Sequence, residues 1–371
     1  MAALRIGVNA LYLIPGGVGG TEIYLRNLLK GLSEVDSRNE YLVFTNRETG
    51  ADLLPRSPNF VHVQQPVRAE SRPLRLLWEQ TGLPAAAARA RLDCLFNPGF
   101  TAPAVSPCPS VTVFHDLQHK RHPEHFRWFD LPFWRAFLYS SAKRSTVLVA
   151  VSEATKADLI RYYKVPASRV HVIPHGVEQE FFEIGRRRGK TDPYILCVST
   201  LHPHKNLERL IRAFAEFRKR RPEFSLILAG MRGFHADAVE ELVQRLKLET
   251  AVRLTGWIPR EELYQLYEQA EACIYPSTFE GFGMPVLEAM AARVPVACSA
   301  IEPLKSVAGE AALLFPPEDE AAIADAMTCL TSEADLRTRL VEAGWARASA
   351  FTWQAAAQKT LEAIQTAVRS R

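Results

Sequence analysis

Two glutamates, Glu280 and Glu288, frame a glycine-rich stretch that reads Glu-Gly-Phe-Gly-Met-Pro-Val-Leu-Glu. The apolar run at 272–275 predicts a strand before it, and Pro285 suits the first turn of a helix, where its missing N–H would have no partner. The free N–H groups and dipole of such a helix favour an anion such as a phosphate. A carboxylate on each side of that anion can accept hydrogen bonds from hydroxyls. The pattern indicates a nucleoside diphosphate sugar, and the alternative is an ordinary turn with two surface glutamates.

A histidine and an aspartate, His115 and Asp116, directly follow the apolar run at 110–114. In open parallel sheets, ligands bind at the carboxyl ends of strands, so this position favours a functional role over a structural one. Three more histidines follow at 119, 122 and 125, but Pro123 interrupts any helix there and no established metal-binding spacing is present. We therefore predict no metal site.

Two loops offer contacts for phosphates. The loop at 16–20 reads Gly-Gly-Val-Gly-Gly between a predicted strand and a predicted helix, where a ligand can approach the backbone closely, although a flexible turn explains it equally well. Lys205 follows the first predicted strand of the second half, and a lysine can act as a mobile positive charge on a phosphate. A surface lysine beside a loop is the alternative.

These motifs resemble those of the family 4 retaining glycosyltransferases over nearly the whole chain. Residues 280–288 are similar to the family's E-x7-E motif. The loop at 199–206 resembles its G-R-x-x-x-x-K-N/G loop, but serine and threonine stand where the family has glycine and arginine, which leaves one charged clamp instead of two. Residues 172–177 resemble I-P-N-G-V, with His175 in place of asparagine.

The resemblance implies an α/β protein of the GT-B fold, in which two Rossmann-like doubly wound domains face each other across a cleft that binds the donor. It also implies roles for individual residues. Those at the reacting sugar, classed as catalytic, are His115, Asp116 and Glu280. Those that bind the sugar, phosphates, ribose or base of the substrates are Gly16, Gly17, Gly19, Gly20, Thr200, Lys205, Gly230, Trp257, Gly281, Phe282, Gly283, Met284, Pro285, Val286 and Glu288.

The chain reads as two successive arrays of alternating strands and helices, which predicts two doubly wound domains. A polar, arginine-rich stretch within 178–192 reads as a linker. We therefore expect an acceptor-side domain over 1–183 and a donor-binding domain over 184–350. The segment 351–371 has a helical pattern, and the resemblance implies that it crosses back to the first domain.

Composition limits the possible partners. The 371 residues carry a net charge of +4, and residues 1–183, with 21 basic and 17 acidic side chains, hold all of the excess. This is too small to indicate nucleic-acid binding. The six cysteines are scattered without a C-x-x-C pair, so we expect buried thiols. We see no signal peptide and no run long enough to span a bilayer, so we expect a cytoplasmic protein, with contact to the inner face of the membrane left open.

We therefore predict an enzyme that transfers a sugar from a nucleotide sugar to a glycan or a polyprenyl-diphosphate-linked acceptor in bacterial polysaccharide synthesis. The stretch 115–124 resembles bacterial mannosyltransferases, which favours GDP-mannose over UDP- or ADP-sugars. The sequence has no D-x-D motif, so we expect neither a metal nor a cofactor. The alternatives are a non-catalytic nucleotide-sugar-binding protein and a GT-B sugar-nucleotide epimerase.

The segment 120–144 alternates basic residues with aromatic ones. Aromatic stripes usually pack into a core, so the first interpretation is a core helix with a basic outer face. The second is contact with a membrane or a lipid-linked acceptor, through aromatic insertion and attraction of cations to anionic headgroups.

Overall fold

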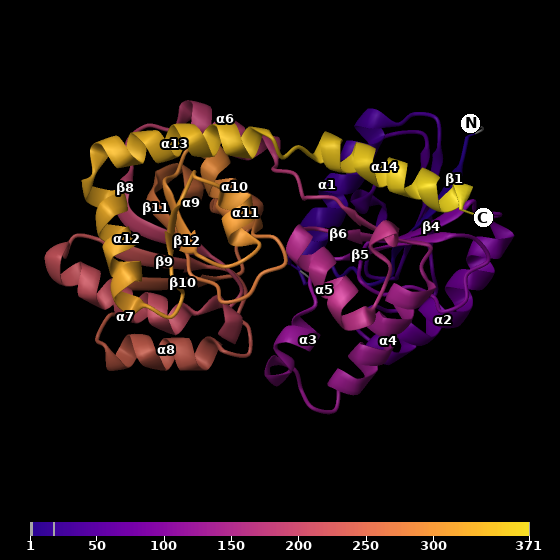
Figure 1. The fold of residues 1–371 in the computed structure, drawn as a ribbon, viewed down its shortest axis with the longest axis horizontal. Coiled ribbons are helices and arrows are strands. Elements are labelled where there is room, and N and C mark those ends of the chain that lie inside the picture. The colour runs from indigo at the N-terminus through magenta and orange to yellow at the C-terminus, as the bar shows by residue number, and fades with distance from the viewer. Residues whose placement is uncertain (1–2, 18, 371) are drawn as a thin grey trace. The chain divides into compact units, whose positions relative to one another are not determined.

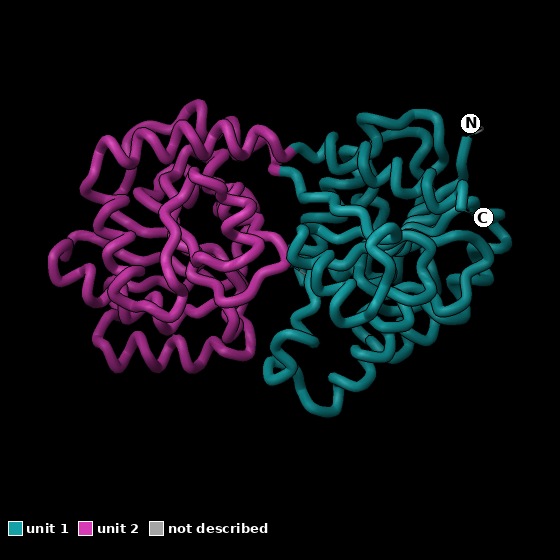
Figure 2. Tube along the Cα trace, in the orientation of Figure 1, with its two compact units in different colours: residues 1–176, 352–371 teal, residues 177–351 magenta. Residues whose placement is uncertain are grey.

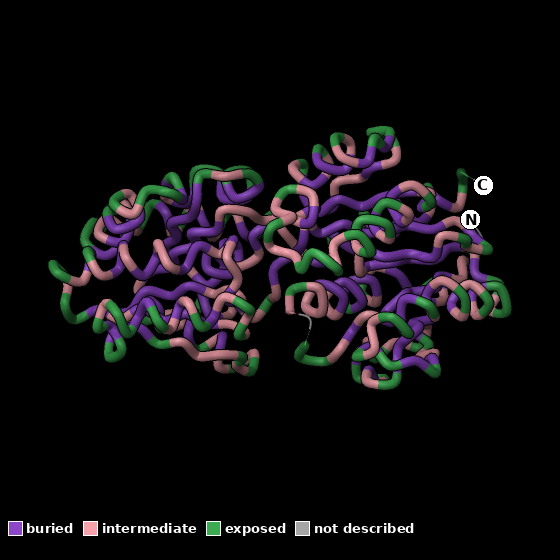
Figure 3. The backbone as a smooth tube through the Cα atoms, turned by 90° about the horizontal axis from the view of Figure 1, so that it is seen from below, coloured by how far each residue is buried: buried purple, intermediate pink, exposed green. Residues whose placement is uncertain are grey.

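A computed structural model describes residues 3–17 and 19–370 of the chain. The chain forms two compact units, residues 1–176 with 352–371 and residues 177–351 (Figure 2). Buried backbone runs through the middle of each unit, where the strands lie (Figure 3).

Unit 1 contains a seven-stranded parallel sheet in the order β3-β2-β1-β4-β5-β6-β7 (Figure 1). Most of its strands are buried on both faces, which is why they read as continuous apolar runs in the sequence. The strands are β1 (Arg5–Ala10), β2 (Glu40–Thr45), β3 (Phe60–Gln64), β4 (Cys94–Asn97), β5 (Ser110–Phe114), β6 (Val147–Ala150) and β7 (Val170–Val172).

Helices cover both faces of this sheet, as in other doubly wound proteins. The last helix of the chain packs along α1, and Gly31 allows the close approach, because a Cβ there would lie 2.7 Å from the carbonyl oxygen of Trp353. The helices of unit 1 are α1 (Gly20–Val35), α2 (Arg72–Arg89), α3 (Gln118–Arg121), α4 (Leu131–Arg144), α5 (Glu153–Tyr163) and α14 (Trp353–Arg369), with short 3-10 turns at Ala51–Leu53, Pro123–His125 and Ala167–Arg169.

Unit 2 contains a six-stranded parallel sheet in the order β10-β9-β8-β11-β12-β13. Its strands are β8 (Asp192–Val198), β9 (Ser225–Ala229), β10 (Val252–Gly256), β11 (Ala270–Tyr275), β12 (Val296–Ser299) and β13 (Leu313–Phe315). Its helices are α6 (Gln179–Arg187), α7 (Leu207–Arg220), α8 (Ala236–Arg245), α9 (Arg260–Gln269), α10 (Met284–Ala291), α11 (Leu304–Ala308), α12 (Glu320–Ser332) and α13 (Ala334–Ser349), with a 3-10 turn, η4, at Pro203–Lys205. The prediction of two doubly wound parallel sheets is therefore confirmed.

The predicted linker within 178–192 is wrong. This stretch forms α6 and the start of β8, and it belongs to unit 2, so the boundary lies after Gly176 rather than at 183. Phe181, Phe182 and Ile184 of α6 are buried, while its arginines are exposed, so the sequence of this short helix with one very polar face resembled a linker.

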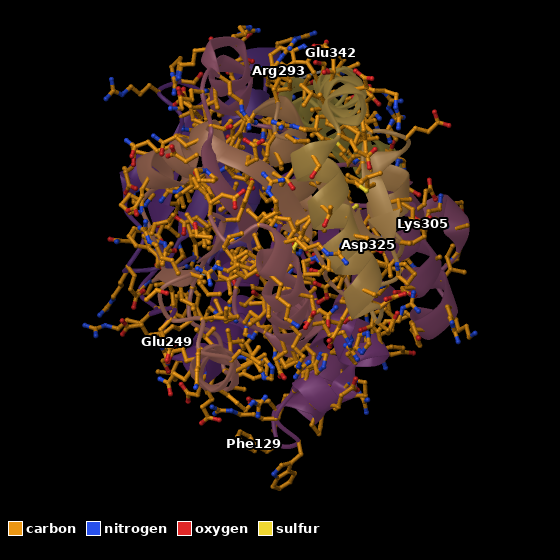
Figure 4. The ribbon with its side chains drawn as sticks, turned by 90° about the vertical axis from the view of Figure 1, so that its left-hand side faces the viewer. Phe129, Glu249, Arg293, Lys305, Asp325 and Glu342 are labelled. Atoms are coloured by element: carbon orange, nitrogen blue, oxygen red, sulfur yellow. The ribbon has the colours of Figure 1, made fainter. Side chains whose placement is uncertain are left out.

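Elsewhere in unit 2, an ion pair of 2.8 Å between Arg293 and Glu342 joins the turn after α10 to α13 (Figure 4).

The strand order places a topological switch point in each unit, between β1 and β4 and between β8 and β11. In open parallel sheets, ligands bind at the carboxyl ends of the strands at such a point. All six cysteines are free thiols and five of them are buried, as expected from their scattered positions. Among the described residues, no helix is long and apolar enough to cross a membrane.

Candidate functional site

The switch point of unit 2 brings together a lysine and a glutamate that are far apart in the sequence. Lys205 lies in the loop after β8, and Glu280 lies in the loop after β11. Lys205 Nζ is 2.6 Å from Glu280 Oε1 and donates a hydrogen bond to the Tyr275 hydroxyl at 3.1 Å. Both charged side chains are largely buried, so solvent screens their attraction less than it would screen an ion pair on the surface.

Backbone contacts hold the two loops of this pair against each other. The Asn206 side chain is buried and donates to the carbonyl oxygens of Pro276 at 3.0 Å and Pro317 at 2.7 Å. The Thr278 N–H donates to the His204 carbonyl at 2.7 Å. Lys205 and Glu280 are therefore fixed by their immediate neighbours, as a preorganised binding site requires.

Two glycines at this site cannot be replaced without movement of the backbone or its neighbours. Gly230 directly follows β9 with φ of 151°, and a Cβ there would lie 2.2 Å from the Ser199 carbonyl oxygen. Gly283 precedes α10 with φ of 108°, and its Cβ would lie 2.4 Å from Leu304. Gly230 therefore lets the turn after β9 pack against the end of β8, and Gly283 lets the loop before α10 pack against α11. The first N–H groups of α10 follow Glu280 in this same loop.

Glu288 lies in a buried polar network. It accepts hydrogen bonds from Arg260 at 3.2 Å and from the Tyr267 hydroxyl at 3.1 Å. Arg260 also pairs with Glu178, which accepts a hydrogen bond from Tyr264 at 2.8 Å. Burial raises the pKa of Glu288, against the opposing pull of the Arg260 charge. Arg260 and Glu178 carry no motif in the sequence, so their link to Glu288 was missed.

The other predicted residues of unit 2 divide into exposed and buried groups. Trp257, just after β10, is exposed, and Thr200 is half-buried in the loop after β8. Phe282 and Val286 are buried, and the Phe282 ring packs 6.0 Å from that of Phe351. These two side chains support the loop, which leaves its backbone as the part that can contact a ligand; Gly281, Met284 and Pro285 lie in the same stretch of backbone.

In unit 1, His115 is buried directly after β5. Its Nε2 lies 2.8 Å from the Pro98 carbonyl oxygen, and because a carbonyl can only accept, Nε2 carries the proton. Burial lowers the pKa of His115 to about 4. The imidazole is therefore neutral at pH 7, and its Nδ1 is the nitrogen that remains for a ligand.

The sequence-based interpretation missed a second buried histidine, His175. Its ring lies 5.5 Å from that of His115, 5.0 Å from Tyr24 and 6.0 Å from Trp353. Burial, with the neighbouring His115, holds the pKa of His175 well below its usual value. The sequence offered one sign of this histidine, because His175 replaces the asparagine of the family pattern at 172–177. In the structure, His175 lies beside His115, the candidate catalytic histidine.

Asp116 and the glycine loop complete the predicted set in unit 1. Asp116 accepts a hydrogen bond of 2.8 Å from the Gln118 N–H and so directs the chain into α3. Glu22 accepts 2.8 Å from the Gly16 N–H and pairs with Arg26 at 2.9 Å. Glu22 therefore fixes one end of the loop that also contains Gly17, Gly19 and Gly20, whereas Val18 lies outside the described residues.

One group of side chains in the described part of unit 1 has the composition of a metal site. Possible ligand atoms of His122, Glu124 and His125 lie within 4.8 Å of one another, and His122 Nδ1 is 3.0 Å from Glu124 Oε1. The group is partly exposed and its contacts are also those of an ordinary surface ion pair. The expectation that the protein needs no metal stays a prediction.

The buried histidine at 115 leads to a prediction about acid stability. The folded protein protonates His115 only near pH 4, whereas the unfolded chain protonates it near pH 6.5. The unfolded chain therefore binds more protons between these pH values, so the free energy of unfolding is unaffected by titration of His115 above pH 6.5 and decreases as the pH falls toward 4. We expect His115→Asn to lose about 3 kcal/mol less stability than the unmodified protein between pH 6.5 and 4. Urea unfolding at several pH values measures this difference, and parallel curves for the two proteins would contradict it.

Comparison with known proteins identifies the family. Residues 178–347 match the model "Glycosyl transferases group 1", and residues 18–181 match "Glycosyltransferase Family 4". The chain is also 30% identical over 266 residues to O-antigen chain mannosyltransferase B of Escherichia coli, covering 69% of this chain and 70% of that protein. The chain belongs to the family 4 glycosyltransferases. This membership confirms the predicted enzyme class.

Solved structures show that this glycosyltransferase has the GT-B fold. Sucrose-phosphate synthase from Thermosynechococcus elongatus matches with a TM-score of 0.80 at 21% identity, covering 99% of this chain and 100% of that one. HepE from Anabaena, in complex with UDP-glucose, matches with a TM-score of 0.74 at 20% identity, covering 98% and 100%. At these identities the likeness concerns the fold, which agrees with the predicted GT-B architecture.

Proposed function

We propose that this glycosyltransferase moves mannose from GDP-mannose to a glycan or a polyprenyl-diphosphate-linked acceptor, with retention of the anomeric configuration. The observation that carries the donor site is the Lys205–Glu280 pair at the switch point of unit 2. It places a cation for phosphate next to a carboxylate for sugar hydroxyls, and that carboxylate lies shortly before the amino end of α10. The name of the E. coli relative supports mannose, and the UDP-glucose bound by HepE keeps a UDP-sugar as the main alternative.

The proposed roles follow the order of groups in the donor. Lys205, with the free N–H groups at the start of α10, balances the diphosphate charge, and Thr200 stands where the family has its arginine. Glu280 and the backbone of Gly281 to Gly283 hold the sugar. Glu288 binds the ribose, and Gly230 and Trp257 lie beside the base. When the diphosphate binds, Lys205 exchanges part of its contact with Glu280 for the phosphate, which releases that carboxylate toward the sugar hydroxyls.

The proposed reaction needs no covalent intermediate on the protein. As the bond between the sugar and the phosphate breaks, positive charge develops on the sugar and negative charge on the leaving diphosphate. Lys205 and the N–H groups of α10 stabilise the negative charge, and such preorganised electrostatic stabilisation is usually the largest single contribution to catalysis. The acceptor oxygen forms a bond to the anomeric carbon on the face that the diphosphate leaves, and the proton of the acceptor hydroxyl passes to the leaving phosphate. The neutral His115 contacts a sugar hydroxyl through Nδ1, and Asp116 orients this part of the loop.

A transfer assay tests this function directly. The protein is incubated with GDP-mannose, UDP-glucose or ADP-glucose, each with and without a lipid-linked glycan fraction, and nucleoside diphosphate release and glycan mass are followed together. The proposal predicts that GDP-mannose gives product with a mass increase of one hexose, and that Lys205→Ala gives none. Epimerised nucleotide sugar without transfer would favour an epimerase, and binding without either reaction would favour a non-catalytic protein.

We expect transfer to continue in EDTA. Lys205 and the helix N–H groups provide the positive charge that a metal supplies in metal-dependent transferases, and the chain has no D-x-D motif. Activity is measured after dialysis against EDTA and again after addition of Mg²⁺ or Mn²⁺. Loss of transfer that a metal restores would contradict this prediction, and His122→Ala would then test the three-residue group described above.

A further inference from the structure

A surface of unit 1 exposes large aromatic side chains at an unusual density. The fractional exposure is 84% for Trp128, 49% for Phe129 and 65% for Phe133. Trp128 and Phe129 form the turn before α4, and Phe129 projects away from the body of its unit (Figure 4). Single exposed apolar residues are ordinary, but a cluster of three within six positions marks an interaction surface.

Some side chains of α4 are exposed and others pack into the core, and aromatic residues are found in both groups. Phe133 and Tyr139 of this helix are exposed, while Leu138 and Ala142 pack into the core of unit 1. The core interpretation of this segment therefore holds for part of it only. Tyr139 also packs edge-on against the Tyr163 ring at 5.8 Å, yet it remains half exposed, and Trp128, Phe129 and Phe133 are exposed to about the same extent or more.

The same segment carries a concentrated positive charge. Residues 118–144 contain six basic and two acidic side chains, so their excess of four equals the net charge of the whole chain. Arg127 lies 6.0 Å from the Phe129 ring, and Lys143 lies 5.6 Å from the Tyr139 ring. Cations and aromatic rings are thus interleaved on one surface, so that both can meet the same partner.

The first turns of α2 extend this surface. Arg72 lies 4.0 Å over the Trp134 ring and 3.9 Å from Asp130, which joins the start of α2 to the start of α4. Leu74 and Leu77, one turn apart on α2, are both exposed. We define the α2–α4 face by nine of the exposed residues on these two helices and on the turn before α4: Leu74, Leu77, Arg127, Trp128, Phe129, Phe133, Arg135, Tyr139 and Arg144.

We propose that the α2–α4 face docks on an anionic lipid surface. Trp128, Phe129 and Phe133 enter the boundary between headgroups and acyl chains, and the surrounding arginines contact anionic headgroups. A second copy of the chain fits poorly as the partner, because two such faces would oppose like charges. The proposal concerns where the enzyme works and does not depend on which donor it uses.

Vesicle sedimentation of the full chain tests the proposal. One set of vesicles is phosphatidylcholine alone, and the other is phosphatidylcholine with an equal part of phosphatidylglycerol. We expect the protein to pellet with the anionic vesicles at low salt and to be released as the salt rises. The double variants Trp128→Ser with Phe129→Ser, and Arg127→Glu with Arg135→Glu, are each expected to bind at least tenfold more weakly.

The control carries the same change of charge elsewhere. Lys219→Glu with Arg220→Glu alters exposed side chains at the end of α7 in unit 2 and should bind like the unmodified protein. Far-ultraviolet circular dichroism and thermal melting verify that every variant is folded. Failure of the unmodified protein to bind either vesicle, or equal binding by all variants, would overturn the proposal. Self-association that the α2–α4 variants abolish would also overturn it and would assign the face to a second copy.

Discussion

Replacement of Glu280 by glutamine is expected to lower the turnover number at least a hundredfold, while free nucleoside diphosphate binds as tightly as before or more tightly. The loss of turnover follows from the proposed contact with the sugar, since removal of one preorganised contact to the transition state commonly costs about 10²–10³ in rate. The unchanged or tighter nucleotide binding follows from the ion pair. Without the Glu280 charge, Lys205 no longer has a carboxylate at 2.6 Å and is free to bind phosphate.

The measurement combines steady-state kinetics with calorimetric titration of the nucleoside diphosphate. Glu216→Gln is a matched control, because Glu216 lies on α7 and contacts only Lys219 among the described residues. The control should keep both turnover and affinity. Near-normal turnover of Glu280→Gln would remove this residue from the reacting sugar. Weaker nucleotide binding by the same variant would contradict the exchange proposed for Lys205.

Replacement of Glu288 by alanine is expected to destabilise the protein by on the order of 3 kcal/mol. Glu288 is buried and accepts hydrogen bonds from the partly buried Arg260 and the buried Tyr267. Its removal therefore takes one acceptor from each of them and leaves Tyr267 with a longer contact of 3.4 Å to the Pro285 carbonyl oxygen. Arg260 keeps its pair with Glu178, which holds the cost below that of a fully unpaired buried charge. Urea unfolding measures the loss, and a variant as stable as the original protein would contradict this network.

Glu288→Gln separates the stabilising contacts from the proposed ribose contact, because the amide keeps the size of the side chain. We expect this variant to melt at a higher temperature than Glu288→Ala and still to bind nucleoside diphosphate about tenfold or more weakly than the original protein, since a charged hydrogen bond contributes about 1.5–3 kcal/mol. Calorimetry on the folded variant checks this. Unchanged affinity would leave Glu288 with a structural role only.

The architecture was predictable where the strands are buried on both faces. β6 consists of apolar residues alone and β5 has two small polar residues among three apolar ones, so these buried runs indicated parallel sheets. The helix α2 was missed, because Pro84 lies inside it and because it buries polar residues. Among these, Glu79 accepts hydrogen bonds from Asn9 at 3.3 Å and Thr101 at 3.0 Å. A buried polar network of this kind hides the apolar periodicity on which sequence reasoning depends.

The sequence predicted which motifs form the candidate site, but it did not predict which of their residues contact one another. Lys205 and Glu280 each stood in a recognisable stretch, yet their contact depends on the sheet order that puts β8 beside β11. The same holds for His115 and His175, whose strands β5 and β7 are separated in the sheet by β6. Such pairs are set by tertiary packing, which local patterns do not encode.

Thermal melting with nucleoside diphosphates tests the central claim, that the Lys205 site of unit 2 binds a nucleotide sugar through its diphosphate. GDP, UDP and ADP are each added to the unmodified protein and to Lys205→Ala. A ligand at a hundred times its dissociation constant adds about 2.7 kcal/mol of stability, which gives a clear rise in melting temperature. The account predicts that GDP gives the largest rise and that Lys205→Ala loses most of it. No rise with any of the three, or an equal rise in both proteins, would contradict the account.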